Sequence, residues 1–92
     1  MNSPLKSLGA RLLLSLIARD RARKCRRVQQ CRDRLVTGNM LVDLHQKRSY
    51  KVIGHNQNSA LLEAVATGDA LIVTLPAAGA TAWDGVGRWS LQ

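Results

Sequence analysis

The stretch GNMLVDLHQKRSYKVIG, residues 38–54, decides the fold class of this chain of 92 residues. It contains two short apolar runs, residues 40–44 and 49–54, and a polar segment with two cations, residues 45–48, separates them. Two such runs on either side of a polar turn predict an antiparallel β-hairpin with a basic tip.

The chain before this hairpin predicts a long helix. Ser3 followed by Pro4 favours a helix start, because the serine oxygen can accept from the first free amides and proline needs no hydrogen bond there. After Gly9 there is no glycine or proline until Gly38. We therefore expect one long helix, or two joined near residues 19–23, that ends at Thr37 and is followed by a left-handed Gly38.

Leucines recur at steps of three and four residues near the start of this helix, which is the spacing of one helical face. The chain has one Tyr, two Trp and no Phe, so its own core is thin, and we expect a protein partner or a second copy to cover this face. The alternative is that the leucines fold back on the protein's own sheet, in which case the chain can act alone. The predicted partner interface consists of Leu5, Leu8, Leu12 and Leu16.

The chain after the hairpin predicts further short elements. A polar break at residues 56–59 favours a short helix over residues 60–67, stopped by Gly68. An apolar run at residues 70–75 predicts a strand, and a turn at Asp84-Gly85 leads to a last strand over residues 86–91.

The expected fold class is therefore α+β. A basic helical arm occupies residues 1–38, and a small antiparallel sheet with one short helix forms a single compact unit over residues 39–92. We expect the two tryptophans, Trp83 and Trp89, to anchor the core of that unit.

The element order expected for residues 58–83, a short helix followed by two strands, is similar to the end of Cro-type phage repressors. In that family a recognition helix precedes a β-hairpin, which would imply DNA binding. Upstream, however, Tyr50 stands where a small residue is expected, and the turn over residues 54–60 is one residue too long. We do not assign the family on this resemblance.

The positive charge of the chain is concentrated near its start. Residues 1–34 hold ten Lys or Arg against Asp20 and Asp33, residues 35–51 carry a net +2, and residues 52–92 carry a net −2. A charge confined to one segment predicts contact with a polyanion such as nucleic acid.

The strongest local indication of nucleic-acid binding is residues 19–34, RDRARKCRRVQQCRDR, since eight of the sixteen are Arg or Lys. The arginine side chain can donate two parallel hydrogen bonds to one phosphate. The basic hairpin can extend the same surface, and Tyr50 there either stacks on a base or, as we favour, packs in the core. The predicted nucleic-acid-binding residues are Arg19, Arg21, Arg23, Lys24, Arg26, Arg27, Arg32, Arg34, Lys47, Arg48 and Lys51.

The sequence predicts no catalytic residue, metal site or cofactor. Asp43 with His45 is the nearest approach to an acid–base pair, and we interpret it as a local surface pair beside a turn. Cys25 and Cys31 diverge on a helix, so we expect free thiols or small core residues rather than zinc ligands or a disulfide. Reduced thiols agree with a cytoplasmic location or one within a virion.

Two functions remain open at this point. The first is a non-enzymatic protein that binds RNA or DNA through its arginine-rich helix. The alternative is a structural or interaction subunit of a larger assembly such as a phage particle, which docks through its N-terminal helix. Binding to a membrane surface is a weaker third possibility, and a targeting role for residues 1–19 also stays open.

Overall fold

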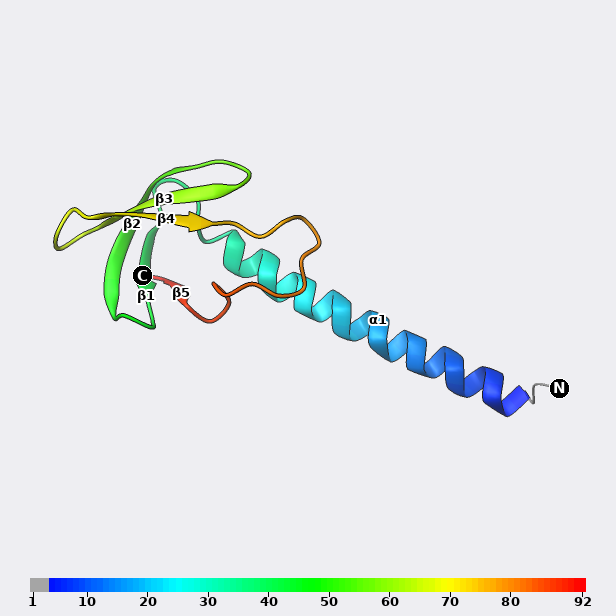
Figure 1. The fold of residues 1–92 in the computed structure, drawn as a ribbon. Helices are drawn as coiled ribbons and strands as arrows, with labels where there is room; N and C mark the ends of the chain where they lie inside the picture. Colours follow the sequence, from blue (N-terminus) through cyan, green and yellow to red (C-terminus); the bar gives the residue numbers. More distant parts are fainter. Residues whose placement is uncertain (1–3) are drawn as a thin grey trace.

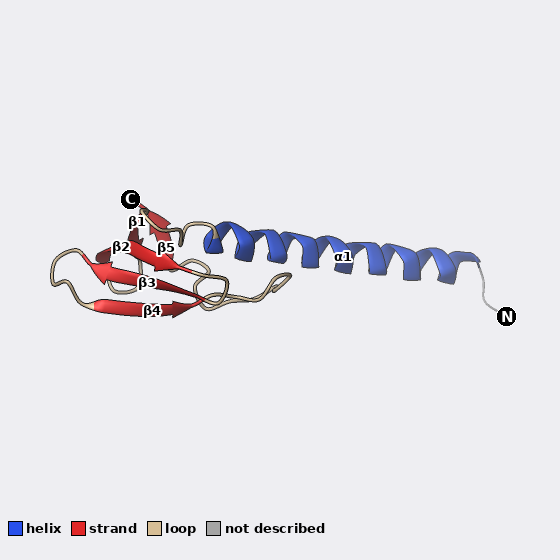
Figure 2. Ribbon diagram, turned by 90° about the horizontal axis from the view of Figure 1, so that it is seen from above, coloured by secondary structure: helices blue, strands red, loops and turns tan. Residues whose placement is uncertain are grey.

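The computed structural model describes the backbone of residues 4–92 and the side chains of residues 12–92. The elements, in chain order, are helix α1 (Pro4–Arg32) and strands β1 (Met40–Asp43), β2 (Arg48–His55), β3 (Ser59–Ala64), β4 (Ala70–Thr74) and β5 (Trp89–Leu91). The α+β class is confirmed, and the N-terminal helix is a single continuous one. Figures 1 and 2 both show α1 as a rod that projects away from a body made of strands.

The prediction that the helix continues to Thr37 is wrong, because α1 ends at Arg32. The amide of Leu35 donates to the carbonyl of Arg32 at 3.0 Å, a tighter turn than an α-helix makes, and the side chain of Asn39 donates to the Arg34 carbonyl at 3.0 Å. The first bond satisfies one of the carbonyls that a helix end leaves free, and the second fixes the turn that follows. Gly38 does take a positive φ of 97°, but in the link to β1, where its amide donates to β2.

The five strands form one antiparallel sheet in the order β4-β3-β2-β1-β5. The predicted hairpin is confirmed as β1 and β2, and Lys47 in its turn has a φ of 55°. The last strand returns to pair with the first, so the C-terminal segment lies beside β1 (Figure 1). That strand is shorter than predicted, because residues 83–88 form tight turns before it.

The predicted short helix over residues 60–67 is wrong, because β3 occupies most of that range. Ala60, Leu62 and Ala64 are buried while Leu61 and Glu63 are exposed, which is the two-residue alternation of a strand. Alanine, leucine and glutamate favour a helix locally, but pairing with β2 and β4 outweighs that preference. The resemblance to Cro-type repressors fails with it, since the described residues contain no helix at the recognition position.

The core lies between the inner side of the sheet and the end of α1. Cys31 and Leu35 from the helix end pack among inner side chains of the strands, with Trp89 at 1% exposure. The ring of Tyr50 meets Trp89 edge-on at 5.8 Å between centroids. Trp89 and Tyr50 are thus core residues, as predicted, whereas Trp83 is half-buried against the core.

Gly85 is where the C-terminal loop docks on the helix. Its carbonyl accepts a hydrogen bond from the Cys31 thiol at 3.0 Å. A Cβ atom at this position would lie 2.6 Å from the ring of Trp83, so only glycine fits without displacing that ring. This contact ties the loop before β5 to α1.

Candidate nucleic-acid interface

Most of α1 stands clear of the body. The protein measures 68 Å along its longest axis, and its radius of gyration is 18.7 Å, against about 12 Å for a compact chain of this length. Val28, Cys31 and Leu35 attach the helix end to the body, each at most 4% exposed. We call residues 12–17 the apolar segment and residues 19–27 the basic segment.

The basic segment presents six exposed cationic side chains. They are Arg19, Arg21, Arg23, Lys24, Arg26 and Arg27. Asp20 is the one acidic residue of the segment, and its carboxylate pairs with Lys24 at 3.0 Å and Arg23 at 2.8 Å. Hydrogen bonds from Lys24 and then Arg23 hold the pKa of Asp20 below its ordinary value, so this carboxylate stays ionised at neutral pH. The other four cations form no ion pair with any carboxylate in the described part of the chain.

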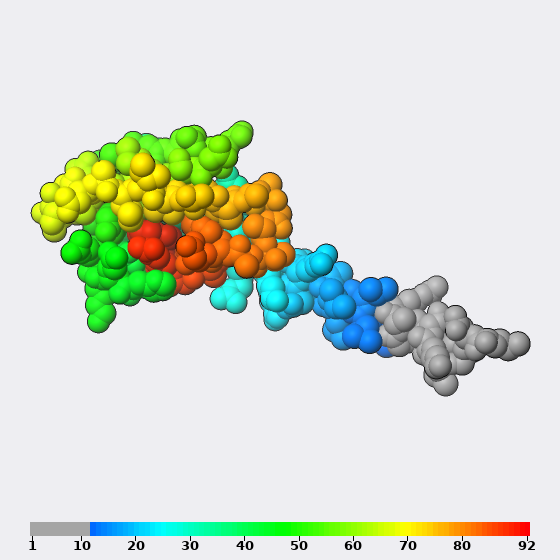
Figure 3. All heavy atoms as spheres, viewed as in Figure 1, coloured from blue at the N-terminus to red at the C-terminus, as the bar shows by residue number. Residues whose placement is uncertain are grey.

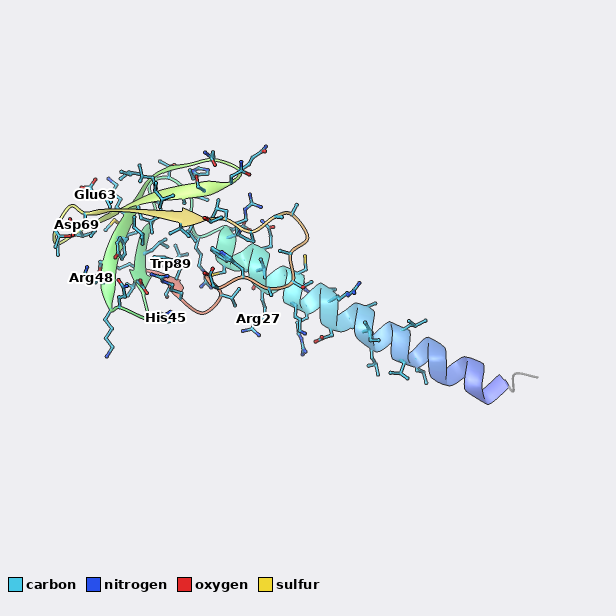
Figure 4. All side chains as sticks on the ribbon, viewed as in Figure 1. Arg27, His45, Arg48, Glu63, Asp69 and Trp89 are labelled. Atoms are coloured by element: carbon cyan, nitrogen blue, oxygen red, sulfur yellow. The ribbon has the colours of Figure 1, made fainter. Side chains whose placement is uncertain are left out.

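Five of the six cations divide between two hollows on the helix. Arg19, Arg23 and Arg26 follow steps of four and three residues and therefore share one face, where they line a shallow hollow with Leu16 and Asp20. Lys24 and Arg27 instead line a hollow of about 340 Å³ against the C-terminal loop. Figure 4 shows Arg27 extending from α1 near that loop. An extended anion on the first face would meet three arginines.

Arg32 and Arg34, also predicted to bind nucleic acid, are engaged with the body. The Arg32 guanidinium donates to the Gln57 carbonyl at 2.8 Å, and the Arg34 guanidinium donates to the Trp89 carbonyl at 2.8 Å. Both side chains are partly buried. They position the helix end on the sheet. The sequence did not reveal this role, because the acceptors are backbone atoms distant along the chain.

The structure does not join the hairpin cations to the basic segment. Lys47 and Arg48 lie at the β1–β2 turn beside a mainly apolar hollow of about 510 Å³, and Lys51 lies on the exposed side of the sheet. Figure 4 shows Arg48 on the part of the body remote from α1. Tyr50 is 5% exposed, so the suggested stacking of its ring on a base is wrong.

The apolar segment is exposed along its whole length, and Figure 3 shows it standing away from the body in blue. Leu12 and Leu16 of the predicted partner interface are 65% and 61% exposed, while the side chains of Leu5 and Leu8 lie outside the described residues. The prediction missed Leu13, Leu14 and Ile17, which are 50 to 66% exposed. The run LLLSLI was the available signal, but the prediction followed a single helical face. In the described residues no helix has the length and apolarity needed to cross a membrane.

The interpretation of Asp43 and His45 as a surface pair is wrong for Asp43, whose side chain is fully buried. Its carboxylate accepts two bonds from the Arg88 guanidinium, at 2.8 and 3.1 Å, and two from the amides of His45 and Gln46. Burial raises the pKa of Asp43, but these four hydrogen bonds outweigh burial and hold it below its ordinary value. The group is a structural ion pair, and His45 is exposed.

The arrangement suits recognition of an extended anion. Nine residues of helix span about 12 Å, and guanidinium groups on such a helix can each bind a separate phosphate oxygen.

Cys25 and Cys31 are free thiols, and residues 12–92 hold no group of three side chains that could bind a metal. Comparisons with protein-family models, with curated proteins and with solved structures find no match.

Proposed function

We propose that this protein is non-enzymatic and binds the phosphate backbone of RNA or DNA through its basic segment. The observation that supports the proposal is the exposure of six cationic side chains on a projecting helix with a single carboxylate among them. A charged helix face that serves only for solubility usually carries both cations and anions. This one carries a net +5 over residues 19–27, from six cations and one anion.

The binding mechanism follows from the helix geometry. An arginine-rich helix can enter a nucleic-acid groove, where each neutralised phosphate releases a condensed counterion. The bonds of Arg32 and Arg34 to the body, together with the buried end of α1, hold the basic segment in a fixed orientation. A segment ordered before binding loses less conformational entropy on contact with its ligand.

Replacement of three helix cations tests this function. The triple variant Arg19→Gln, Arg23→Gln, Arg26→Gln should bind a mixed-sequence DNA duplex about 100-fold more weakly at about 0.1 M salt, because three phosphate contacts and their counterion release are lost. The plot of log affinity against log salt should also become shallower by about 2 to 3 units. Fluorescence anisotropy over a salt series, with duplex DNA and single-stranded RNA, measures both quantities.

A matched control removes the same charge from the body. The variant Lys47→Glu with Arg48→Gln removes the same three units of charge but keeps the basic segment and Lys51, so it should lose less than about fivefold in affinity. Equal losses in the two charge-matched variants would mean that net charge alone drives binding. No binding of either nucleic acid by the wild type at low salt would remove the proposal.

A second function is favoured by the apolar segment. Five large apolar side chains exposed on one projecting helix are unusual for a protein that acts alone. We therefore keep the proposal that the chain is a subunit of a larger assembly, such as a phage particle, and docks through its N-terminal helix. The basic segment would then meet acidic protein or packaged nucleic acid.

Replacement of two leucines tests this alternative. Leu12→Gln with Leu16→Gln should abolish stoichiometric copurification of a partner protein from the native host, because the docking surface gains two polar side chains. Stability should change by less than about 0.5 kcal/mol, since both positions are exposed and glutamine favours a helix. The control Leu44→Gln with Leu91→Gln alters exposed leucines of the body and should keep the partner. A nuclease-treated wild-type sample that yields no partner protein would contradict the docking.

A further inference from the structure

The sheet has an outer face that nothing in the described chain covers. The end of α1 and the loop before β5 pack on the inner side, so the alternate side chains of the strands point to solvent. Large apolar side chains are conspicuous among them: Met40 is 36% exposed, Ile53 41%, Leu61 37%, Val65 57% and Ile72 71%. These five residues together with Lys51 and Glu63 are called the outer face below.

The charged residues of the outer face lie next to each other in its middle. In the strand register Met40 is opposite Lys51, and Lys51 is opposite Glu63. Lys51 and Glu63 form no ion pair with each other or with any other described residue. With Met40, Ile53 and Val65 they line a hollow of about 320 Å³. One cation and one anion are thus available to a partner within an apolar ring.

We infer that a second copy of this chain covers the outer face, related by a two-fold axis that brings Lys51 of each copy against Glu63 of the other copy. A two-fold interface pairs each residue with its counterpart in both directions, so a surface with one cation beside one anion complements itself. The remainder of the chain is strongly cationic and would repel a copy, whereas this face is neutral. An apolar ring around the charges excludes water and strengthens the two ion pairs.

The size of the face sets the strength of the dimer. Four strands about 4.8 Å apart, and about five residues long at 3.3 Å each, offer a patch on the order of 19 Å by 16 Å. This patch of about 300 Å² on each copy is below the usual size of specific interfaces, so we expect a weak dimer with a Kd of about 1 to 100 μM. Figure 4 shows Glu63 on the part of the body remote from α1, so both projecting helices stay accessible in such a dimer. If the basic segment binds nucleic acid as proposed, two linked segments would raise avidity by about 100-fold or more.

Charge reversal with mixing tests the dimer without any nucleic acid. In sedimentation equilibrium of nuclease-treated protein, Lys51→Glu alone and Glu63→Lys alone should each weaken self-association at least about tenfold, because like charges then meet across the two-fold axis. An equimolar mixture of the two variants should recover wild-type affinity. In the mixed dimer the introduced glutamate of one chain meets the introduced lysine of the other, and the native Glu63 of the first meets the native Lys51 of the second. Each chain in the mixture keeps its own like-charge neighbours, so effects within one chain cannot produce the recovery.

Three further samples complete the experiment. The double variant Lys51→Glu with Glu63→Lys should dimerise like the wild type, and Leu12→Gln with Leu16→Gln should leave the dimer unchanged. If a charge variant does not fold, Val65→Gln with Ile72→Gln probes the same surface and should weaken the dimer at least about tenfold. A wild type that stays monomeric at about 500 μM, or a mixture no tighter than its components, would overturn the inference. Neither result bears on nucleic-acid binding, which is measured separately.

Discussion

Arg88→Met is expected to destabilise the protein by about 3 to 5 kcal/mol, more than Asp43→Asn, although the two residues form one ion pair. Asp43 has a side-chain exposure of 0% and Arg88 one of 28%. Removal of Arg88 leaves a buried carboxylate without a counter-ion, whereas an unpaired Arg88 can turn towards water. The guanidinium also lies 4.8 Å from the centre of the Trp89 ring, a contact that methionine keeps only in part.

Asp43→Asn should cost about 1 to 3 kcal/mol. The asparagine carbonyl can still accept the hydrogen bonds that the amides of His45 and Gln46 donate to Asp43 Oδ1, so the turn after β1 keeps these bonds. Guanidinium denaturation of the wild type, both single variants and the double variant measures the interaction free energy between Asp43 and Arg88. The double variant should cost less than the sum of the single ones, because it leaves no unpaired buried charge. Equal costs of the two single variants would contradict the burial difference on which this prediction rests.

The same pair predicts how stability depends on pH. The pKa of Asp43 is lowered in the folded protein, so its contribution to stability is complete above the ordinary aspartate pKa and is lost as the pH falls through the lower, folded value. The stability difference between wild type and Asp43→Asn should therefore shrink below a pH of about 4. A difference that stays constant down to a pH of about 2 would mean that the carboxylate of Asp43 is not the group that titrates.

The sequence predicted the elements whose signals are local. Helix α1 and the β1–β2 hairpin were predicted because apolar spacing, breakers and turn residues all act within a few positions. The strand β3 was missed because local helix preference was weighed above a two-residue alternation in Ala60, Leu62 and Ala64. Sheet pairing decided that segment, and pairing partners cannot be read from one sequence.

The candidate site was predictable in composition but not in arrangement. The exposed cations of the basic segment follow directly from the arginine-rich run. The sequence did not decide whether Leu12 and Leu16 pack on the sheet or project, and the structure leaves both exposed. By contrast, Arg34 and Asp43 have partners 55 and 45 residues away, at Trp89 and Arg88. Contacts at such separations depend on the folded chain, so the sequence could not distinguish these two charges from solvated ones.

Trp89→Ala should destabilise the protein by about 3 to 5 kcal/mol, the cost of a large cavity in a core of this kind. The side chain of Trp89 is 1% exposed, meets the Tyr50 ring edge-on and lies 4.8 Å from the Arg88 guanidinium, and alanine loses all of these contacts. A domain of about 90 residues has only about 5 to 14 kcal/mol of total stability. The melting temperature should therefore fall by at least about 12 °C.

Trp83→Ala is the matched control, because it removes the same side chain from a half-buried position. Its indole donates to the Thr74 carbonyl at 3.0 Å, so we expect a cost of about 1 to 2 kcal/mol. Thermal and guanidinium unfolding, followed by circular dichroism, compare the two variants directly. Equal costs would place Trp83 in the core as well. A smaller cost for Trp89→Ala than for Trp83→Ala would mean that the core does not depend on the indole of Trp89.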